Sequence, residues 1–158
     1  MQVFSPREFR NALARFATGV TVVTAIQNGN LHAMTANSFV SVSLDPPLVL
    51  VSLDNCSHMH LILPEIGRYG ISVLAEHQKA LSNHFAGRSI GETDIRFIER
   101  AGTMLLDGAI AHFVVKVFCT YPAGDHTLYV GCVEYFEYRE DKPLLFYAGC
   151  YQQLLIPG

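Results

Sequence analysis

Charged side chains are scarce in this sequence: they make up 16% of its residues, whereas half of the residues are hydrophobic. Typical soluble domains carry about 25% charged residues. The net charge is −3 and no block of lysine and arginine is present, which argues against nucleic acid as a main partner. A chain of 158 residues is expected to form one domain, residues 1–158, and its apolar excess predicts burial against another subunit.

A long apolar run is also absent. The longest candidate, Leu44 to Leu53, contains Asp45 and two prolines, and it falls far short of the ~18 apolar residues that a membrane span needs. Residues 1–15 carry three arginines and a glutamate without an apolar core, so no signal peptide is expected. The sequence therefore predicts a cytoplasmic protein with no membrane partner.

Several motifs of metal and nucleotide sites are missing. The four cysteines form no Cys-x-x-Cys pair, and in a reducing compartment they are expected to be buried, small apolar side chains. Cys56 beside His58 and His60 is the nearest approach to a metal site, but zinc needs closely spaced ligand pairs, so no metal is expected. No G-x-G-x-x-G, Walker A or G-x-S-x-G motif occurs, so a dinucleotide would have to bind without a Rossmann domain.

The residue pattern is mostly that of β-strands. Helical spacing predicts a short helix over residues 4–16, with Ser5 as N-cap, and two more over residues 58–63, ending near Pro64, and 76–85. β-branched and alternating residues predict strands over residues 20–26, 31–36, 39–44, 48–53, 69–74, 111–120, 127–138 and 144–148. Turns are expected at Asn28-Gly29 and 121–124, and an irregular crossing over 88–102. Without regular alternation of strands and helices, this favours a closed antiparallel barrel.

Two stretches in the first half of the chain carry groups suited to a ligand. Residues 34–39 end a strand in small polar side chains that could meet the polar edge of a planar heterocycle, although an ordinary polar strand end looks the same. Residues 52–58 leave a strand and enter a helix, where free N–H groups and serine hydroxyls favour a phosphate. Ser57 serves equally well as a plain N-cap.

Two further stretches lie in the last third. Gly124-Asp125-His126 places a histidine after a glycine turn, where an imidazole could face a ligand, although a lone histidine is more often structural. In residues 147–151, Gly149 permits close backbone approach and the tyrosines could stack on rings, although core packing explains them too.

Together, in their order and spacing, these stretches resemble the short-chain flavin reductase family. Its members are the reductase components of two-component flavin-dependent monooxygenases, and their fold is mainly β, an antiparallel split β-barrel with a few short helices. The resemblance rests on residues 9–24 (FRNALARFATGVTVVT), 34–39, 41–48, 72–76, 78, 85–88, 124–126, 131, 144–147, 149 and 151. It therefore covers nearly the whole chain.

The resemblance implies two binding sites. One is for FMN or FAD, with Thr35, Ala36, Asn37 and Ser38 at the ring and ribityl chain, Ser52, Asp54, Asn55, Ser57 and His58 at the phosphate region, and Phe85 and Ala86, with Arg88 nearby, closing the site. The other is for NADH or NADPH, with His126, Gly149, Cys150 and Tyr151. The family often has Gly-Arg-Tyr where this chain has Gly149-Cys150-Tyr151, which removes a cation from the second site.

The function implied is hydride transfer from NADH or NADPH to flavin N5 in a homodimer, with reduced flavin released to a separate oxygenase. The cofactors perform the redox step and the protein orients them. His126, the candidate catalytic residue, could stabilise reduced flavin or bind the nucleotide. Two alternatives stay open: an FMN-binding electron carrier or sensor with little NAD(P)H activity, which Cys150 favours, and a non-enzymatic dimer whose loops bind another anion.

Overall fold

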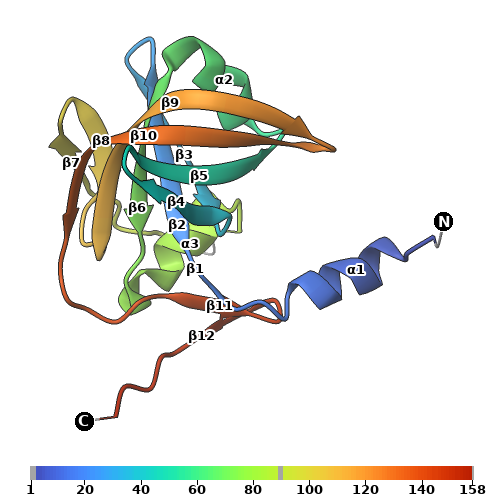
Figure 1. Cartoon of the computed structure of the whole chain (residues 1–158). Helices are drawn as coiled ribbons and strands as arrows, with labels where there is room; N and C mark the ends of the chain where they lie inside the picture. The colour runs from blue at the N-terminus through green and yellow to red at the C-terminus, as the bar shows by residue number, and fades with distance from the viewer. Residues whose placement is uncertain (1–2, 89–90, 158) are drawn as a thin grey trace.

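The computed structural model describes residues 3–88 and 91–157, and a curved antiparallel sheet forms its body (Figure 1). The seven strands of this sheet, in sequence order, are β2 (Thr21–Gln27), β3 (Asn30–Ala36), β4 (Phe39–Leu44), β5 (Pro47–Asp54), β6 (Arg68–Val73), β9 (Ala111–Ala123) and β10 (His126–Tyr138). They lie in the order β3-β2-β6-β9-β10-β5-β4. Within the described residues no ladder joins the edge strands β3 and β4, so the expectation of a closed barrel is wrong, whereas the mainly β split-barrel fold is confirmed.

The core lies on both faces of β2. Val23 packs in one hydrophobic cluster with residues of α2 (His58–Ile66), whereas Val22 packs in a second cluster with Leu74 and Leu106. Successive side chains of a strand point to opposite faces, so a strand buried on both faces is apolar throughout. This explains the unbroken β-branched run that predicted the strand.

The N-terminal elements form as expected. Ser5 caps α1 (Pro6–Leu13) and accepts a hydrogen bond from the Glu8 N–H over 3.4 Å. Asn28 and Gly29 both have positive φ, 51° and 78°, as a type I′ turn requires, and they join β2 to β3. α1 buries none of its residues, and Figure 1 shows it projecting away from the sheet.

The helix predicted to end near Pro64 is longer than expected. α2 continues to Ile66 and ends at Gly67, which adopts φ 69°. A proline inside a helix leaves the carbonyl four residues earlier without its N–H donor. Here that carbonyl belongs to His60, and it accepts a hydrogen bond from the Tyr129 hydroxyl at 3.3 Å. A strand distant in sequence therefore supplies the missing donor.

Two loop predictions are also corrected. The crossing over residues 88–102 contains β7 (Phe97–Arg100), which forms a hairpin with β8 (Thr103–Leu106). β9 continues to Ala123 and so includes most of the turn expected at residues 121–124, and the chain reverses at Gly124-Asp125. β6 pairs with β9 only as far as Lys116, so the edge of β9 that faces away from β10 has no partner strand at Pro122. Proline lacks a backbone N–H, and at this unpaired edge its absence removes no hydrogen bond between strands.

A small sheet near the chain ends lies below the main sheet (Figure 1). Its strands are β1 (Thr18–Gly19), β11 (Leu145–Tyr147) and β12 (Cys150–Gln152), in the order β1-β11-β12. β11 confirms the predicted final strand, whereas β12 was not expected. The Ala148 N–H donates to the Ala14 carbonyl at 2.9 Å, which joins this hairpin to the end of α1.

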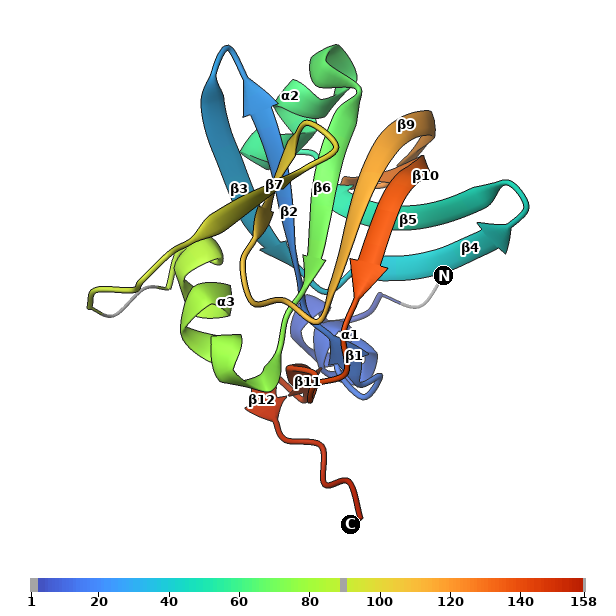
Figure 2. The same ribbon diagram turned by 90° about the vertical axis from the view of Figure 1, so that its left-hand side faces the viewer.

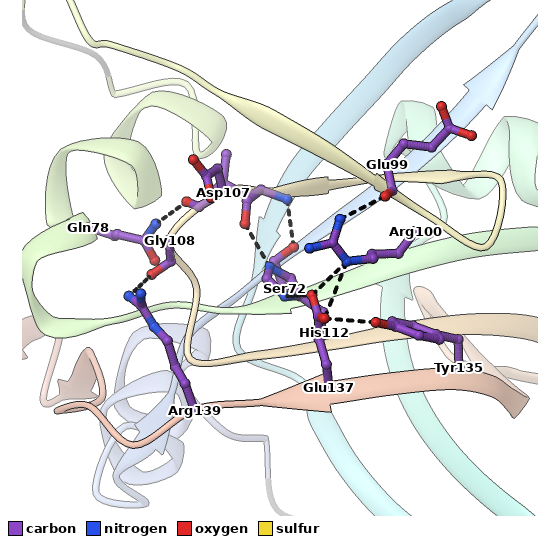
Figure 3. A network of polar contacts seen from close by, with 11 residues as sticks. Ser72, Gln78, Glu99, Arg100, Asp107, Gly108, His112, Tyr135, Glu137 and Arg139 are labelled. Carbon is purple, nitrogen blue, oxygen red and sulfur yellow. Dashed lines mark hydrogen bonds and ion pairs between the residues drawn. The ribbon is translucent and has the colours of Figure 1, made fainter.

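A polar network fastens the β7–β8 hairpin to β9 and β10 (Figure 3). The Glu137 carboxylate accepts from the Tyr135 hydroxyl at 2.7 Å and from Arg100 Nε at 3.1 Å, and its Oε1 lies 3.1 Å from His112 Nδ1. The hydrogen bonds from Tyr135 and Arg100 lower the pKa of the Glu137 carboxyl. His112 Nε2 lies 2.8 Å from the Leu106 carbonyl, so the imidazole bridges two strands.

The cysteines are free, but the expectation that they are buried is wrong. Cys56 and Cys150 are exposed, and Cys119 and Cys132 are partly exposed. Cys56 lies in the turn before α2, and Cys150 begins the short strand β12, outside both core clusters. Among residues 3–88 and 91–157, no helix is both long enough and apolar enough to cross a membrane.

Candidate functional site

The end of β3 faces α3 (Lys79–Phe85) and the β11–β12 hairpin across a hollow of about 160 Å³, here called the ring hollow. Its lining combines small, polar and aromatic side chains: Val20, Thr35, Ala36, Asn37, Ser82, Ala86, Arg88, Phe146 and Tyr151. Figure 2 shows α3 beside the foot of β3 and β12 below it. The structure therefore brings four of the predicted flavin residues, Thr35, Ala36, Asn37 and Ala86, next to Tyr151, which was predicted for the nicotinamide.

Ser82 connects the two sides of the ring hollow. The Thr35 hydroxyl donates to the Ser82 carbonyl at 2.7 Å, and the Ser82 and Tyr151 hydroxyls share a hydrogen bond of 2.7 Å. The Tyr151 hydroxyl also donates to Asn83 Oδ1 at 3.1 Å. Ser82 is fully buried, and it was not among the predicted site residues. The sequence feature that could have indicated Ser82 is its position: it is a small polar residue three positions before Phe85, on the same side of the predicted helix.

The Asn37 side-chain amide lines the ring hollow without an intramolecular hydrogen-bond partner among the described residues. Its side chain makes no hydrogen bond within the described residues, and it lines both the ring hollow and a neighbouring hollow of about 300 Å³ next to Phe16 and Phe39. The Ser38 hydroxyl, in contrast, donates to the Ser52 carbonyl at 2.7 Å and accepts from the Ser52 N–H at 3.2 Å. Ser38 thereby ties the ring hollow to β5, and Asn37 alone of this pair offers its side chain to a ligand.

Ala86 and Arg88 line the ring hollow, but Phe85 does not. The Phe85 ring packs 6.1 Å from the Phe97 ring, centroid to centroid, and belongs to the second core cluster. The Arg88 N–H donates to the Asn83 carbonyl at 2.8 Å, which holds the arginine just beyond the end of α3. Phe85 therefore anchors the helix, whereas Ala86 and Arg88 border the open space.

The remaining predicted flavin residues form the β5–α2 loop, residues 52–58. Asp54 Oδ1 accepts from the Cys56 N–H at 2.7 Å, and Ser57 caps α2 by accepting from the His60 N–H at 3.2 Å. The Thr127 hydroxyl donates to Asn55 Oδ1 at 2.7 Å, which binds this loop to β10. The first turn of α2 holds no acidic residue, so the positive end of its helix dipole is open to an anion.

His58 and His126 flank this loop. The exposed His58 ring lies 4.5 Å from the His32 ring, centroid to centroid. His126 pairs with Asp54 in the β10–β5 ladder, and its Nδ1 lies 2.7 Å from Asp125 Oδ1. The hydrogen bond with His126 lowers the pKa of the Asp125 carboxyl. The His126 side chain is 41% exposed, so the rest of the ring is open to a ligand.

The four predicted nicotinamide residues do not gather in one place within this chain. Tyr151 lines the ring hollow, Gly149 lies in the exposed turn between β11 and β12, and His126 lies beside the β5–α2 loop. Cys150 is the exposed first residue of β12. Tyr151 lines the ring hollow and a second hollow next to Glu76 and Lys79, and His126 is in the wall of neither. The Ser38–Ser52 hydrogen bonds are the structural link between the two regions.

The ring hollow fits part of a planar, polar ring system. Ala36 and Ala86 leave room for close approach, the Asn37 amide can donate and accept hydrogen bonds, and Arg88 supplies positive charge. Complete ligand pockets measure roughly 300–1,000 Å³, so a hollow of about 160 Å³ covers one side of such a ligand. Among residues 3–88 and 91–157, no group of three or more His, Cys, Asp or Glu side chains could hold a metal ion.

Known proteins are similar to this chain in sequence and in fold. The family profile described as Flavin reductase like domain matches residues 13–155. An NADH-dependent flavin reductase of Rhodococcus sp is 47% identical over 157 residues, which cover 98% of this chain and 89% of that protein. The structure of flavin reductase PheA2 in its native state gives a TM-score of 0.94 at 42% identity and covers 97% of this chain and 100% of that chain.

A third likeness concerns a structure with ligands. It is the NADH:FAD oxidoreductase SgcE6 of Streptomyces globisporus C-1027 in complex with NAD and FAD fragments, with a TM-score of 0.88 and 33% identity over 98% of both chains. The family match extends over most of the sequence, and both the relative and the solved structures align over nearly their full lengths. This chain therefore belongs to the flavin reductase family.

Proposed function

We propose that this chain reduces flavin with NADH and hands the reduced flavin to a separate flavin-dependent oxygenase. The observation that carries this proposal is the ring hollow, in which Ser82 ties the β3 strand end to Tyr151. Relatives that match nearly the whole chain are named NADH-dependent flavin reductases and reductase components of monooxygenases. Their names support both the reaction and the separate oxygenase.

The side chains of the ring hollow bind and orient the reactants. When bound, flavin supplies the hydride acceptor and NADH the hydride donor. Asn37 hydrogen-bonds the polar edge of the ring, Ala36 and Ala86 let it approach the backbone, and Tyr151 forms an aromatic wall. No side chain needs to move a proton in the hydride step. Correct orientation alone is worth up to ~7–11 kcal/mol in favourable intramolecular reactions.

The β5–α2 loop holds the flavin phosphate in this proposal. N–H groups at the start of α2 point outward, and the Ser57 hydroxyl can donate its own proton while it accepts from the His60 N–H. His58 lies exposed on the same turn. The Asp54 carboxylate would repel a phosphate, and its hydrogen bond from Cys56 makes it a loop-shaping residue.

His126 serves the nicotinamide nucleotide in this proposal. Its Nδ1 is held by Asp125, so Nε2 faces outward beside the β5–α2 loop. His126→Ala should therefore slow the reduction of flavin by NADH and leave flavin affinity nearly unchanged. Stopped-flow reduction and a flavin fluorescence titration measure the two effects separately. A loss of flavin affinity would instead place His126 in the flavin site.

A second copy of the chain completes the site in this proposal. The edge strand β4 exposes Val40, Val42 and Leu44, and the C-terminal segment exposes Leu155. α1 has no buried residue, and a free helix of this length is marginal in water, so it needs cover. Such apolar surface is typical of subunit interfaces. Analytical ultracentrifugation should find a homodimer that Val42→Glu weakens, and a monomeric wild-type chain with full activity would exclude it.

Residues 1–158 act as one domain in this proposal, because the sheet and both core clusters draw on strands from both halves of the sequence. The reaction belongs in the cytoplasm, where NADH is regenerated and where free cysteines such as these four stay reduced.

The direct test mixes the purified protein with NADH and FMN and follows the loss of NADH absorbance and of flavin colour under anaerobic conditions. NADH oxidation well above background is expected. Binding of FMN without NADH oxidation would favour the electron carrier or sensor. A protein that neither quenches FMN fluorescence nor oxidises NADH would favour the non-enzymatic dimer.

A further inference from the structure

The first turn of α2 depends on one residue, His60. The His60 N–H donates to the hydroxyl of Ser57, the N-cap, at 3.2 Å. The His60 carbonyl lacks its usual helical donor, because Pro64 has no N–H. The orientation of the turn that follows the β5–α2 loop therefore depends on what contacts His60 from outside the helix.

Tyr129 of β10 contacts His60 at two atoms. The Tyr129 hydroxyl oxygen lies 2.7 Å from His60 Nδ1 and 3.3 Å from the His60 carbonyl oxygen. A hydroxyl has one proton and a carbonyl can only accept, so all three groups are satisfied when Nδ1–H donates to the tyrosine and the tyrosine donates to the carbonyl. Tyr129 is 1% exposed, and burial raises the pKa of its phenol, so the hydroxyl keeps the proton that it donates.

The same strand holds the other end of the β5–α2 loop. Thr127 lies two positions before Tyr129 and therefore points to the same face of β10. The Thr127 hydroxyl donates to Asn55 Oδ1 at 2.7 Å, and the Asn55 N–H donates to the Asp125 carbonyl at 2.9 Å. β10 lies between β5 and β9 in the sheet, so both anchors belong to an interior strand. One strand thus holds the loop before and after Ser57.

The groups that this anchored turn presents to an anion are few. The Asn55 and Ser57 N–H groups donate to backbone carbonyls, and the Cys56 N–H donates to the Asp54 carboxylate. The first N–H groups of a helix have no acceptor inside the helix, and in α2 they belong to His58 and the residue after it. A phosphate that accepts from these N–H groups and from the Ser57 hydroxyl needs all of them at a set spacing.

We infer that Tyr129 is a positioning residue for the flavin phosphate: through His60 it fixes the first turn of α2, and it does not itself contact the flavin. This inference rests on the proposed function, which assigns the phosphate to this turn. Riboflavin has the same ring system as FMN but no phosphate. Tyr129, which does not line the ring hollow, should therefore govern the preference for FMN over riboflavin and leave binding of the ring unchanged.

The test is a fluorescence titration of the purified protein with FMN and with riboflavin. Tyr129→Phe removes the hydroxyl and keeps the ring. It should weaken FMN binding by about tenfold, as for one lost hydrogen bond to a buried group, and change riboflavin affinity by less than about twofold. In steady-state reduction by NADH, KM for FMN should rise while kcat stays close to wild type. His60→Ala should reduce the preference for FMN in the same way, and the double variant should lose no more, because both changes break one contact.

Pro64→Ala separates positioning from helix stability. Alanine returns the N–H that completes the helical hydrogen bond to the His60 carbonyl, but it adds no contact between α2 and β10. When Pro64→Ala is combined with Tyr129→Phe, the urea midpoint should recover in part, whereas the preference for FMN stays reduced. Recovery of both together would overturn the inference, because Tyr129 would then act only by stabilising the helix. The same background keeps the test open if Tyr129→Phe alone folds poorly.

Tyr69→Phe is the matched control. Tyr69 is also fully buried and belongs to the same core cluster as Tyr129, but its hydroxyl has no hydrogen-bond partner among the described residues. Its removal should leave both flavin affinities unchanged. The inference is overturned if wild type prefers FMN and Tyr129→Phe keeps that preference, or weakens both flavins equally. A wild-type protein that binds FMN no better than riboflavin would contradict the phosphate site of the proposed function, and this inference with it.

Discussion

Two networks of polar side chains join distant parts of this chain. They differ in whether their side chains keep hydrogen-bonding groups or ring faces open to a ligand. In the network of Figure 3, Glu137 takes hydrogen bonds from Tyr135 and Arg100 and contacts His112, so its polar atoms are consumed within the protein. In the ring hollow, Ser82 and Tyr151 are bonded to each other, but the Tyr151 ring and the Asn37 amide face open space. The first network joins strands of the fold, whereas the second leaves free the groups to which the proposed function assigns flavin binding.

A cluster of polar and ionisable residues is therefore not by itself a site. Glu137, Arg100 and His112 would look catalytic by residue type, yet each is already satisfied by a partner from another strand. Mutations should therefore separate the two networks. Changes in the first should affect stability alone, and changes in the second should affect flavin affinity.

The largest effect is expected for Glu137→Ala. Arg100, Tyr135 and the buried His112 all lose their acceptor, which should lower the free energy of unfolding by about 2–3 kcal/mol. Urea denaturation measures this loss. The flavin affinity of the folded variant should not change, and a matching fall in affinity would show that this network also shapes the site.

The control for that variant is Glu134→Ala. Glu134 pairs with Arg68 at 2.6 Å, and the two side chains are 35% and 43% exposed, against 33% and 40% for Glu137 and Arg100. Exposure is thus matched, but Glu134 has no further partner among the described residues. Its loss should cost less than about 1 kcal/mol.

Next in size is Asn37→Ala. Removal of the uncommitted amide should weaken flavin binding by about tenfold, close to the value of one hydrogen bond, and leave the free energy of unfolding within about 0.5 kcal/mol of wild type. Flavin fluorescence quenching measures the first quantity and urea denaturation the second. Asn30→Ala, at the exposed start of β3, is the control. Equal flavin affinities for both variants would remove Asn37 from the site.

A smaller effect is expected for the Ser82–Tyr151 hydrogen bond, which contributes both to stability and to the predicted flavin site. Ser82→Ala and Tyr151→Phe should each cost about 1 kcal/mol of stability and weaken flavin binding a few fold, because the tyrosine wall loses a support. The two changes break the same bond, so the double variant should lose less than the sum. Full additivity would mean that the hydroxyls act independently.

The smallest effect should come from pH. The pKa of the Glu137 carboxyl is lower in the folded chain than its ordinary value of 4.5, so the unfolded chain takes up the proton first as the pH falls. This carboxylate contributes its full stabilisation at pH values above the ordinary pKa of 4.5. That contribution is lost as the pH falls toward the lower pKa that Glu137 has in the folded chain. Glu137→Gln should therefore show a shallower loss of thermal stability between about pH 6 and about pH 3 than wild type. Equal slopes would contradict a lowered pKa.

Much of the fold was predictable because its signals are local. Ser5 and Pro6 mark the start of α1, Asn28-Gly29 fixes the first hairpin, and the β-branched run before it is buried on both faces. The failures have non-local causes. α2 passes Pro64 because Tyr129 donates to the His60 carbonyl, and β9 tolerates Pro122 because no strand pairs with its outer edge there.

The sequence by itself determined a mainly β chain and, through the order of its motifs, the family, and it named the stretches that are predicted to carry the site. Only the tertiary structure decided which of these residues meet. Thr35 reaches Ser82 across 47 positions and Ser82 reaches Tyr151 across 69, whereas His126 lies beside the β5–α2 loop instead of in the ring hollow. Hydrogen bonds between such distant residues depend on how strands and helices pack, and no pattern within a short segment records that packing.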